Sequence, residues 1–193
     1  MYDLILKNIS RFIQLTAEET HFFTSQLKLK HVNKKEFLIQ EGEICRYIFY
    51  VNKGCLRTFF VDPKGTEHNV LFAIDDWWTG DLQSFNTQTA ARYNIAALED
   101  TDAVLIEKDA LEELYTKIPK LEKLFRHLYQ NALISLQDRV LSTMCDPAEV
   151  RYQTFRRKYP IMDSRIPQNQ IASFLGITPE SLSRIRKQIA DKK

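Results

Sequence analysis

The sequence has few cysteines, and it lacks the patterns in which cysteine carries structure or redox chemistry. Only three of its 193 residues are cysteine, and they lie far apart at Cys45, Cys55 and Cys145. An odd number of widely spaced thiols predicts neither a disulfide framework nor a CxxC pair, and it favours a reducing cytoplasm. Because iron–sulfur clusters are commonly held by about four thiolates, this count also argues against a cluster-based sensor.

Long apolar runs and enzyme signatures are also missing. No run of eighteen apolar residues occurs, so we expect no membrane span, and the first ten residues lack the basic stretch and cleavage site of a signal peptide. GxSxG, HExxH and P-loop patterns are absent, and the four histidines are scattered through the chain. We therefore expect a cytoplasmic protein with no catalytic residues, no metal site and no membrane partner.

The composition and the distribution of charge indicate a globular protein with one basic end. Hydrophobic residues make up 44% of the chain and charged residues 27%, which is enough to bury a core. Residues 146–193 hold ten Lys or Arg against five Asp or Glu, whereas the rest of the chain is slightly acidic. A basic segment suits contacts with phosphates. The alternative is a solvated basic tail without a binding role.

Hydropathy patterning divides the chain into a short helical start, a β-rich middle and a helical end. Residues 4–27 have a helical pattern, in which Thr16 and Glu19 form a capping signature. Between about 28 and 108, β-branched and aromatic runs alternate with turn signals, which predicts a β-sandwich or β-roll. The expected strands cover residues 37–39, 47–51, 55–61, 69–74, 93–97 and 103–106.

After residue 109, apolar residues recur at alternating spacings of three and four, as in a coiled-coil seam. Pro119 suits only the first turn of a helix, so we expect a long helix over about 119–144. A further helix is expected over about 147–158, followed by a loop between Pro160 and Pro167. The long helix either packs on its own β-roll or pairs with a second copy of itself. We favour the homodimer, with an interface formed by Leu121, Phe125, Leu128, Ala132 and Leu136.

Two short helices separated by a tight turn are expected near the end of the chain. The first covers about 167–174, and Gly176 lies just beyond it, where a left-handed backbone suits glycine. Thr178 then caps the second helix, which begins at Pro179. This arrangement predicts a helix–turn–helix, the alternative being an ordinary solvent-facing helical hairpin.

The second helix of the pair has an apolar face and a polar face. Leu182, Ile185 and Ile189 share the apolar face, so we expect them to point into the protein. The N-terminal end of such a helix enters the major groove of DNA, where Arg184 would bind guanine and Glu180 would accept from cytosine or position Arg184. The predicted DNA-contacting residues are Gln168, Glu180, Ser181, Ser183, Arg184 and Lys187. Of these, Gln168 and Ser181 are expected to contact phosphates.

At these residues the chain resembles a known family of regulators. The segment 171–185 resembles the helix–turn–helix of the Crp/Fnr transcription regulators, in particular the short members common in the Bacteroidetes. The segments 41–43, 47–54 and 78–81 resemble the β-roll of a cyclic-nucleotide-binding domain. The long helix resembles the dimerisation helix of that family. The resemblance covers nearly the whole chain.

The resemblance implies an α+β protein that regulates transcription as a homodimer. Its parts would be an N-terminal double-stranded β-roll sensor domain over residues 1–118, a long dimerisation helix over 119–145, and a DNA-binding domain over 146–193. The last would be a helix–turn–helix of the winged-helix type with a truncated C-terminus. The implied partners are double-stranded DNA with a palindromic operator, a second copy of the chain and, as a further candidate, RNA polymerase. The rival hypothesis is a cyclic-nucleotide or small-ligand sensor that signals through a protein partner.

The family's ligand site is only partly reproduced. Members that bind cyclic AMP carry a Gly-Glu pair for the ribose and an Arg-Ser pair for the phosphate, whereas this chain has Gly80-Asp81 and Ala91-Arg92 at those places. The Arg therefore stands one place late, and in extended backbone such a shift turns the side chain to the other face. The sequence therefore leaves open whether the β-roll binds a small ligand, and it argues against cyclic AMP as that ligand. It identifies no cofactor. The candidate ligand-binding residues are Gly80, Asp81, Leu82, Arg92 and Tyr93.

Overall fold

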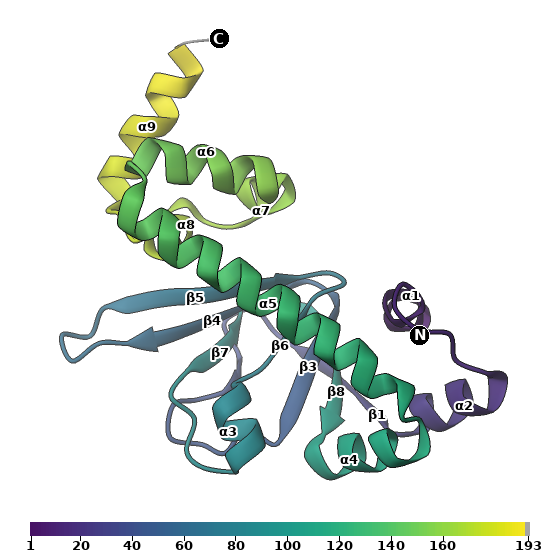
Figure 1. Cartoon of the computed structure of the whole chain (residues 1–193). Coiled ribbons are helices and arrows are strands. Elements are labelled where there is room, and N and C mark those ends of the chain that lie inside the picture. The colour runs from purple at the N-terminus through teal and green to yellow at the C-terminus, as the bar shows by residue number, and fades with distance from the viewer. Residues whose placement is uncertain (192–193) are drawn as a thin grey trace. The chain divides into compact units, whose positions relative to one another are not determined.

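The computed structural model describes residues 1–191 and has the α+β architecture expected from the sequence (Figure 1). The chain forms two compact units. The first comprises residues 1–60 and 71–131, and the second comprises residues 61–70 and those from 132 onward. Among the described residues, no helix is both long and apolar enough to cross a membrane.

Two four-stranded sheets form the expected β-roll. Their strand orders are β1-β8-β3-β6 and β2-β7-β4-β5. Strands β1 and β3 pair with β8, β2 and β4 pair with β7, and β6 pairs with β3, all antiparallel. The strands are β1 (Leu27–Val32), β2 (Phe37–Ile39), β3 (Tyr47–Lys53), β4 (Cys55–Val61), β5 (Glu67–Ile74), β6 (Trp78–Thr79), β7 (Asn94–Ala97) and β8 (Thr101–Glu107).

The helices of the first unit include elements that the hydropathy pattern did not separate. The region 4–27, predicted as helical, contains two helices with a break over residues 11–16, and the capping box of Thr16 and Glu19 is confirmed. Strand β1 was missed because four of its six side chains are exposed, which hides the alternation that marks a strand. The helices are α1 (Asp3–Ser10), α2 (Ala17–Ser25), α3 (Leu82–Thr87), α4 (Lys108–Lys117) and α5 (Lys120–Cys145).

The first half of α5 belongs to the core of the β-roll. Leu121, Leu124 and Phe125 are buried with the apolar side chains of the strands. The Phe125 ring lies 5.5 Å from the Trp78 ring and 5.6 Å from the Tyr115 ring, both in edge-on arrangements that favour aromatic pairs. Burial of an aromatic side chain contributes about 1.5–3 kcal/mol to folding. This half of the helix is therefore stabilised by packing against the β-roll of the same chain.

The second unit contains four helices besides the end of α5. They are α6 (Ala148–Lys158), α7 (Pro160–Arg165), α8 (Gln168–Leu175) and α9 (Pro179–Asp191). The loop predicted between Pro160 and Pro167 was wrong, because α7 occupies most of it. Pro160 is the first residue of α7, a position in which the missing N–H of proline costs nothing. Proline therefore marked a helix start that was interpreted as a loop boundary.

The tip of the β4–β5 hairpin lies in this second unit and contacts α8. The Ser173 hydroxyl donates to the Glu67 carbonyl at 2.9 Å and accepts from the Asn69 N–H at 3.0 Å. It thereby replaces a neighbouring strand at two positions of β5. The Asn69 side chain donates to the backbone carbonyl and to the side-chain oxygen of Gln170, at 3.1 and 2.8 Å. Gln170 and Ser173 are thus engaged with the hairpin.

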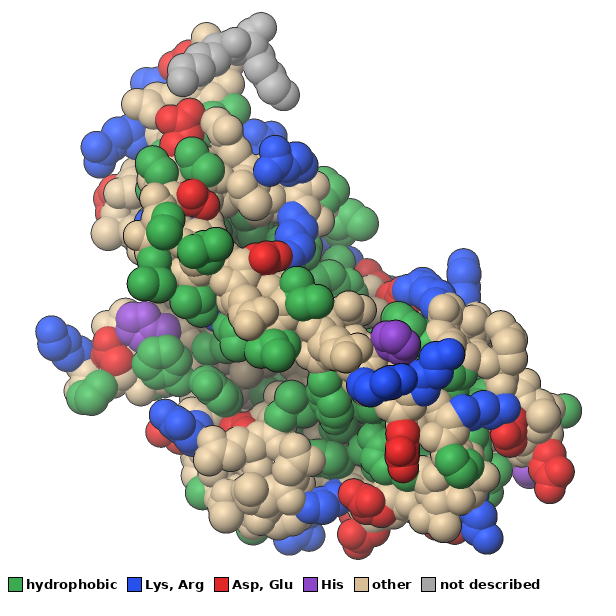
Figure 2. Space-filling model, viewed as in Figure 1, with side chains coloured by type: hydrophobic (Ala, Val, Ile, Leu, Met, Phe, Trp, Pro, Cys, Tyr) green, Lys and Arg blue, Asp and Glu red, His purple; other side chains and the backbone are tan. Residues whose placement is uncertain are grey.

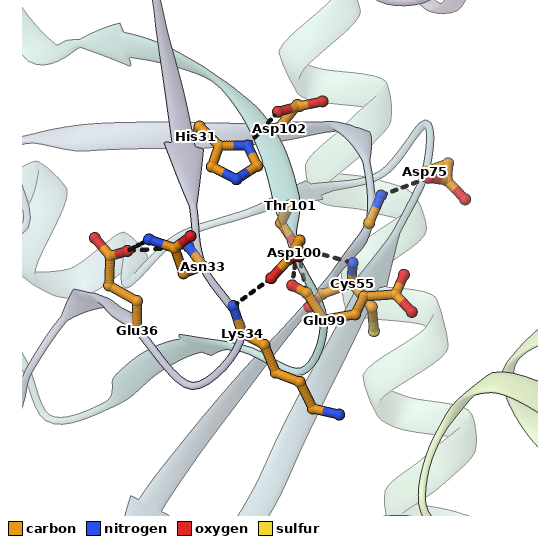
Figure 3. Close-up of polar contacts among 11 residues, drawn as sticks. His31, Asn33, Lys34, Glu36, Cys55, Asp75, Glu99, Asp100, Thr101 and Asp102 are labelled. Atoms are coloured by element: carbon orange, nitrogen blue, oxygen red, sulfur yellow. Dashed lines mark hydrogen bonds and ion pairs between the residues drawn. The ribbon is translucent and has the colours of Figure 1, made fainter.

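A tight turn joins β3 to β4 at Gly54, which has a φ of +113°. The Gly54 N–H donates to Asp75 at 2.7 Å and the Cys55 N–H donates to the Thr101 hydroxyl at 3.1 Å (Figure 3). A Cβ at position 54 would lie 2.6 Å from the Cα of Thr101. The turn therefore requires glycine both for its backbone conformation and for the close approach of the two chain segments.

We expect Gly54→Ala to lower the free energy of unfolding of the full chain by about 2–4 kcal/mol, because strain at positive φ adds to a clash with backbone. Urea denaturation followed by circular dichroism measures this loss. Gly42→Ala is the matched control, since Gly42 has a φ of +92° but a Cβ added there would meet no atom of the described residues within 4 Å. It should cost about 1 kcal/mol from the backbone alone. Equal losses in the two variants would contradict the role of the close approach.

Candidate nucleic-acid interface and ligand site

The turn between α8 and α9 is built by local hydrogen bonds and a left-handed glycine. Gly176 has a φ of +65°, and the Ile177 N–H donates to the Ala172 carbonyl at 3.0 Å. Arg151 of α6 donates to the Leu175 carbonyl at 2.8 Å, which satisfies one of the carbonyls left free at the end of α8. These contacts fix the direction in which the chain enters α9.

The start of α9 is capped as the sequence predicted. The Thr178 hydroxyl accepts from the Ser181 N–H at 3.2 Å, and α9 begins at Pro179. Hydrogen bonds from its own backbone N–H and from Thr178 hold the pKa of the Glu180 carboxyl below its usual value. Glu180 is therefore ionised at neutral pH and lies at the positive end of the helix dipole.

The two faces of α9 separate as expected. Leu182 and Ile185 are buried against the rest of the unit, and Ile189 is half-buried. Of the candidate DNA-contacting residues of α9, Glu180, Ser183, Arg184 and Lys187 are exposed and Ser181 is half-buried. Gln168, at the start of α8, is also exposed. Glu180, Arg184 and Lys187 are spaced by four and three, so they form one row along the helix. This row offers one carboxylate and two cations to a partner.

A polar cluster that the sequence analysis did not identify holds α9 from behind. We call Tyr152, Arg156, Asp163 and Arg186 the Asp163 cluster. The Asp163 carboxylate accepts from the Tyr152 hydroxyl at 2.8 Å, from Arg186 at 3.1 Å and from the Arg156 Nε at 3.1 Å. It thereby joins α6, α7 and α9. Periodicity shows which residues share a face of one helix, but it does not show which residue of another helix lies opposite.

The predicted dimer residues fall into two groups. Leu121 and Phe125 are buried in the core of their own β-roll, and Leu128 is half-buried. That burial takes Leu121 and Phe125 out of the proposed interface, because a partner would have to open the core to reach them. Ala132 and Leu136 are exposed.

The second half of α5 carries an apolar surface that is open to solvent. We call the residues Leu133, Ile134, Leu136, Val140, Leu141 and Met144 the α5 seam. Their side chains are 47–78% exposed. Exposed apolar side chains are visible over the upper part of α5 in Figure 2. A contiguous group of this kind is typical of an interaction surface.

In the β-roll, the structure brings the two halves of the candidate ligand site together through Asp81. This residue is 1% exposed and caps α3, its Oδ1 accepting from the Ser84 N–H at 3.0 Å. Its Oδ2 accepts from the N–H groups of Arg92 and Tyr93, at 3.0 and 3.3 Å. Three backbone donors thus engage both oxygens of the carboxylate. A ribose hydroxyl would have to compete with these three donors for a carboxylate that is almost completely buried.

The side chains at the second pair point in opposite directions. Ala91 is buried and its backbone exchanges hydrogen bonds with Gly42 and Glu43, whereas the Arg92 side chain is exposed. Leu82 is 41% exposed. The residues present therefore do not fit a cyclic nucleotide in the manner of a ribose carboxylate and a buried phosphate arginine. Within residues 1–191, no group of His, Cys, Asp and Glu side chains is arranged to hold a metal ion.

Comparison with known proteins gives matches along most of the chain. The family description "Cyclic nucleotide-binding domain" matches residues 29–117. The transcriptional activator protein Anr of Pseudomonas aeruginosa is 26% identical over 185 residues, which cover 90% of this chain and 75% of that protein. The transcriptional activator protein FnrA of Stutzerimonas stutzeri is 27% identical over 165 residues, which cover 80% and 67%.

Solved structures share the same fold. FixK2 from Bradyrhizobium japonicum superposes with a TM-score of 0.75 at 20% identity, over 86% of this chain and 85% of that one. A CooA variant from Carboxydothermus hydrogenoformans superposes with a TM-score of 0.72 at 15% identity, over 97% and 84%. The combination of β-roll, long helix and helix–turn–helix is therefore a known architecture.

Proposed function

We propose that this chain, which resembles the Crp/Fnr-type transcription regulators, is itself a DNA-binding transcription regulator, because its residues 29–117 match the cyclic nucleotide-binding domain and the relatives that match most of its length are transcriptional activators. The observation that carries this proposal is the exposed row of Glu180, Arg184 and Lys187 on a helix whose opposite face is buried. Such a regulator acts in the cytoplasm, where the chromosome lies, and RNA polymerase is its natural further partner. The relatives named above are regulators and not enzymes.

The row on α9 suits the major groove of DNA. Arg184 would bind O6 and N7 of guanine, a bidentate contact worth about 1–3 kcal/mol of discrimination between bases. Glu180 would accept from cytosine or hold Arg184 in place. Lys187 and Ser183 lie beside them, and Gln168 and Ser181 at the helix starts would contact phosphates, which set the register of the protein on the duplex.

Replacing Arg184 with Ala should lower the ratio of affinities for operator over random DNA about tenfold, because the base contact is lost. Fluorescence anisotropy with a palindromic site from upstream of the protein's own gene and with a scrambled duplex measures both affinities. Binding of the wild type should weaken steeply with salt, through release of phosphate counterions.

The charge-matched control is Arg46→Ala, which removes an exposed arginine from the β-roll and should leave the ratio unchanged. Equal loss on operator and scrambled DNA in Arg184→Ala would show that Arg184 contacts only phosphate. A wild-type protein that binds neither duplex would favour the rival function, a sensor with a protein partner.

We further propose that the α5 seam is the surface through which two copies associate. Within it, Leu133, Leu136 and Val140 follow one another at spacings of three and four, the spacing of a coiled-coil seam, and Tyr129 lies four residues before Leu133. All four are at least 38% exposed. Two copies related by a two-fold axis would bury this apolar surface and would present two α9 helices to a palindromic operator, with half-sites about 34 Å apart.

Leu136→Asp should convert the dimer to a monomer at micromolar concentration, because the seam would then bury two unpaired carboxylates. Light scattering coupled to size-exclusion chromatography measures the mass. Leu29→Asp makes the same change at an exposed position of β1 and should leave the mass unchanged. A wild-type protein that is monomeric at about 100 μM would rule out the seam as a stable interface.

We propose that any small ligand of the β-roll is recognised without the ribose contact of cyclic AMP binders, because Asp81 already accepts three backbone hydrogen bonds. The Arg92 side chain is exposed, so the cyclic phosphate would also lack a buried guanidinium. Neither the ribose contact nor the phosphate contact of cyclic AMP binders can then form unless the side chains of this site rearrange.

Cyclic AMP at millimolar concentration should therefore change the melting temperature by less than about 1 °C. A ligand present at a hundred times its Kd would stabilise the fold by about 2.7 kcal/mol, which shifts melting by several degrees. Differential scanning fluorimetry measures the shift, and AMP serves as the control nucleotide. A saturable rise with cyclic AMP and none with AMP would contradict this interpretation of Asp81.

A further inference from the structure

The Asp163 cluster connects the DNA-facing helix to two other helices at one point. Arg186 of α9 donates to the Tyr152 hydroxyl at 2.8 Å and to the Asp163 carboxylate at 3.1 Å. Tyr152 is fully buried, and the Asp163 side chain is 15% exposed. Burial and the hydrogen bond to Asp163 raise the pKa of Tyr152 to about 12, so its hydroxyl keeps the proton that it donates.

Arg186 lies on the side of α9 that faces the protein. At 100° per residue it is about 40° from Leu182 around the helix axis, and therefore well away from the row of Glu180, Arg184 and Lys187. Its guanidinium lies 5.8 Å from the centre of the Tyr152 ring, and that of Arg156 lies 5.7 Å from the same ring. Both cations also contact the Asp163 carboxylate, whose single negative charge is shared between them.

Apolar contacts and the Asp163 cluster constrain α9 in different ways. Leu182 and Ile185 hold the helix against the unit and decide which face of it is buried, but hydrophobic contact is non-directional and leaves small rotations about the helix axis weakly defined. Hydrogen bonds between a guanidinium and a carboxylate are directional. A base-reading side chain must be held within roughly 10–20° of its productive orientation. The Arg186–Asp163 contact supplies the directional restraint.

We propose that Asp163 is a positioning residue for DNA reading: by binding Arg186 it sets the rotation of α9 and thus the direction in which Arg184 points. This role rests on the proposed function of α9. It is distinct from a DNA contact, since Arg186 and its partner Asp163 lie on the side of α9 that faces the protein, away from the row of Glu180, Arg184 and Lys187. It is also distinct from a general contribution to folding, because it concerns the orientation of one helix.

Loss of Asp163 would also leave two cations without their carboxylate. An open cavity of about 430 Å³ next to it is lined by Gln153, Arg156, Arg157, Pro160, Asp163 and Ile189. The released Arg156 therefore has room to turn toward solvent. Greater positive charge strengthens sequence-independent attraction to the phosphates of DNA. Asp163→Asn should thus weaken discrimination while it strengthens binding to random DNA.

Two variants separate the loss of helix positioning from the change in charge, because one adds a positive charge to the cluster and the other removes one. In Asp163→Asn and in Arg186→Gln, the ratio of operator to scrambled-DNA affinity should fall about tenfold, as for loss of one base contact. Affinity for scrambled DNA should rise in Asp163→Asn and fall in Arg186→Gln. Asp191→Asn, at the exposed end of α9, makes the same charge change as Asp163→Asn and should leave the ratio unchanged.

Hydrogen exchange provides a readout that does not involve DNA. The amides of residues 182–190 should exchange at least several-fold faster in both variants, with the amides of α8 unchanged, because only α9 loses its directional restraint. If Asp163→Asn does not fold, Arg186→Gln keeps the test, since it removes the same contact from the other side. Faster exchange in every helix of the unit would indicate a merely structural role and would overturn the proposal.

The outcomes distinguish this proposal from the function on which it rests. Specific binding by the wild type with an unchanged ratio in both variants would remove the role of Asp163 and leave the function intact. A lower ratio in Arg186→Gln alone would make Arg186 a direct DNA contact and would also overturn the proposal. A wild type without any preference for its operator would remove the proposed function, and this role with it.

Discussion

The constraint on which the second unit depends is the close packing of α8 against α9. The two helices are in contact, and Ala172 of α8 is buried, as are Leu182 and Ile185 of α9. Once that face of α9 is buried, helical periodicity forces Glu180, Arg184 and Lys187 to the outside. The glycine turn, the threonine cap and the Arg151 contact all serve this packing, since each fixes how the chain passes from one helix to the next.

Helix α5 shows how one apolar stripe can have two different uses. Its first half, around Leu121 and Phe125, is part of the core of the β-roll, whereas the α5 seam in its second half is exposed. The stripe looks continuous in the sequence because both uses require apolar residues at the same spacing. Burial alone separates them, and it limits the proposed interface between copies to the second half of the helix.

Polar contacts over long sequence distances decide what the family-like motifs of the β-roll can do. The Gly80-Asp81 pair was recognisable, and its proximity to Arg92 and Tyr93 was expected. The use of the Asp81 carboxylate was not, because one methylene less than in glutamate lets it cap α3 and bind the backbone of the neighbouring segment. The hydrogen bonds of Ser173 to β5 could not be predicted from the sequence either, because they join residues more than one hundred positions apart.

Local signals in the chain were enough to define four features: the capping box at Thr16, the long helix after Pro119, the glycine turn at Gly176 and the two faces of α9. These follow from backbone sterics and hydrogen bonds within a few residues. The short elements α3, α7 and β6 carry too few residues for a periodic signal, so they were missed. Only the folded chain shows which half of α5 is buried and which groups Asp81 binds. It alone also shows that Asp163 contacts Arg186. Those contacts depend on how distant segments are brought together, and no spacing along the chain encodes that.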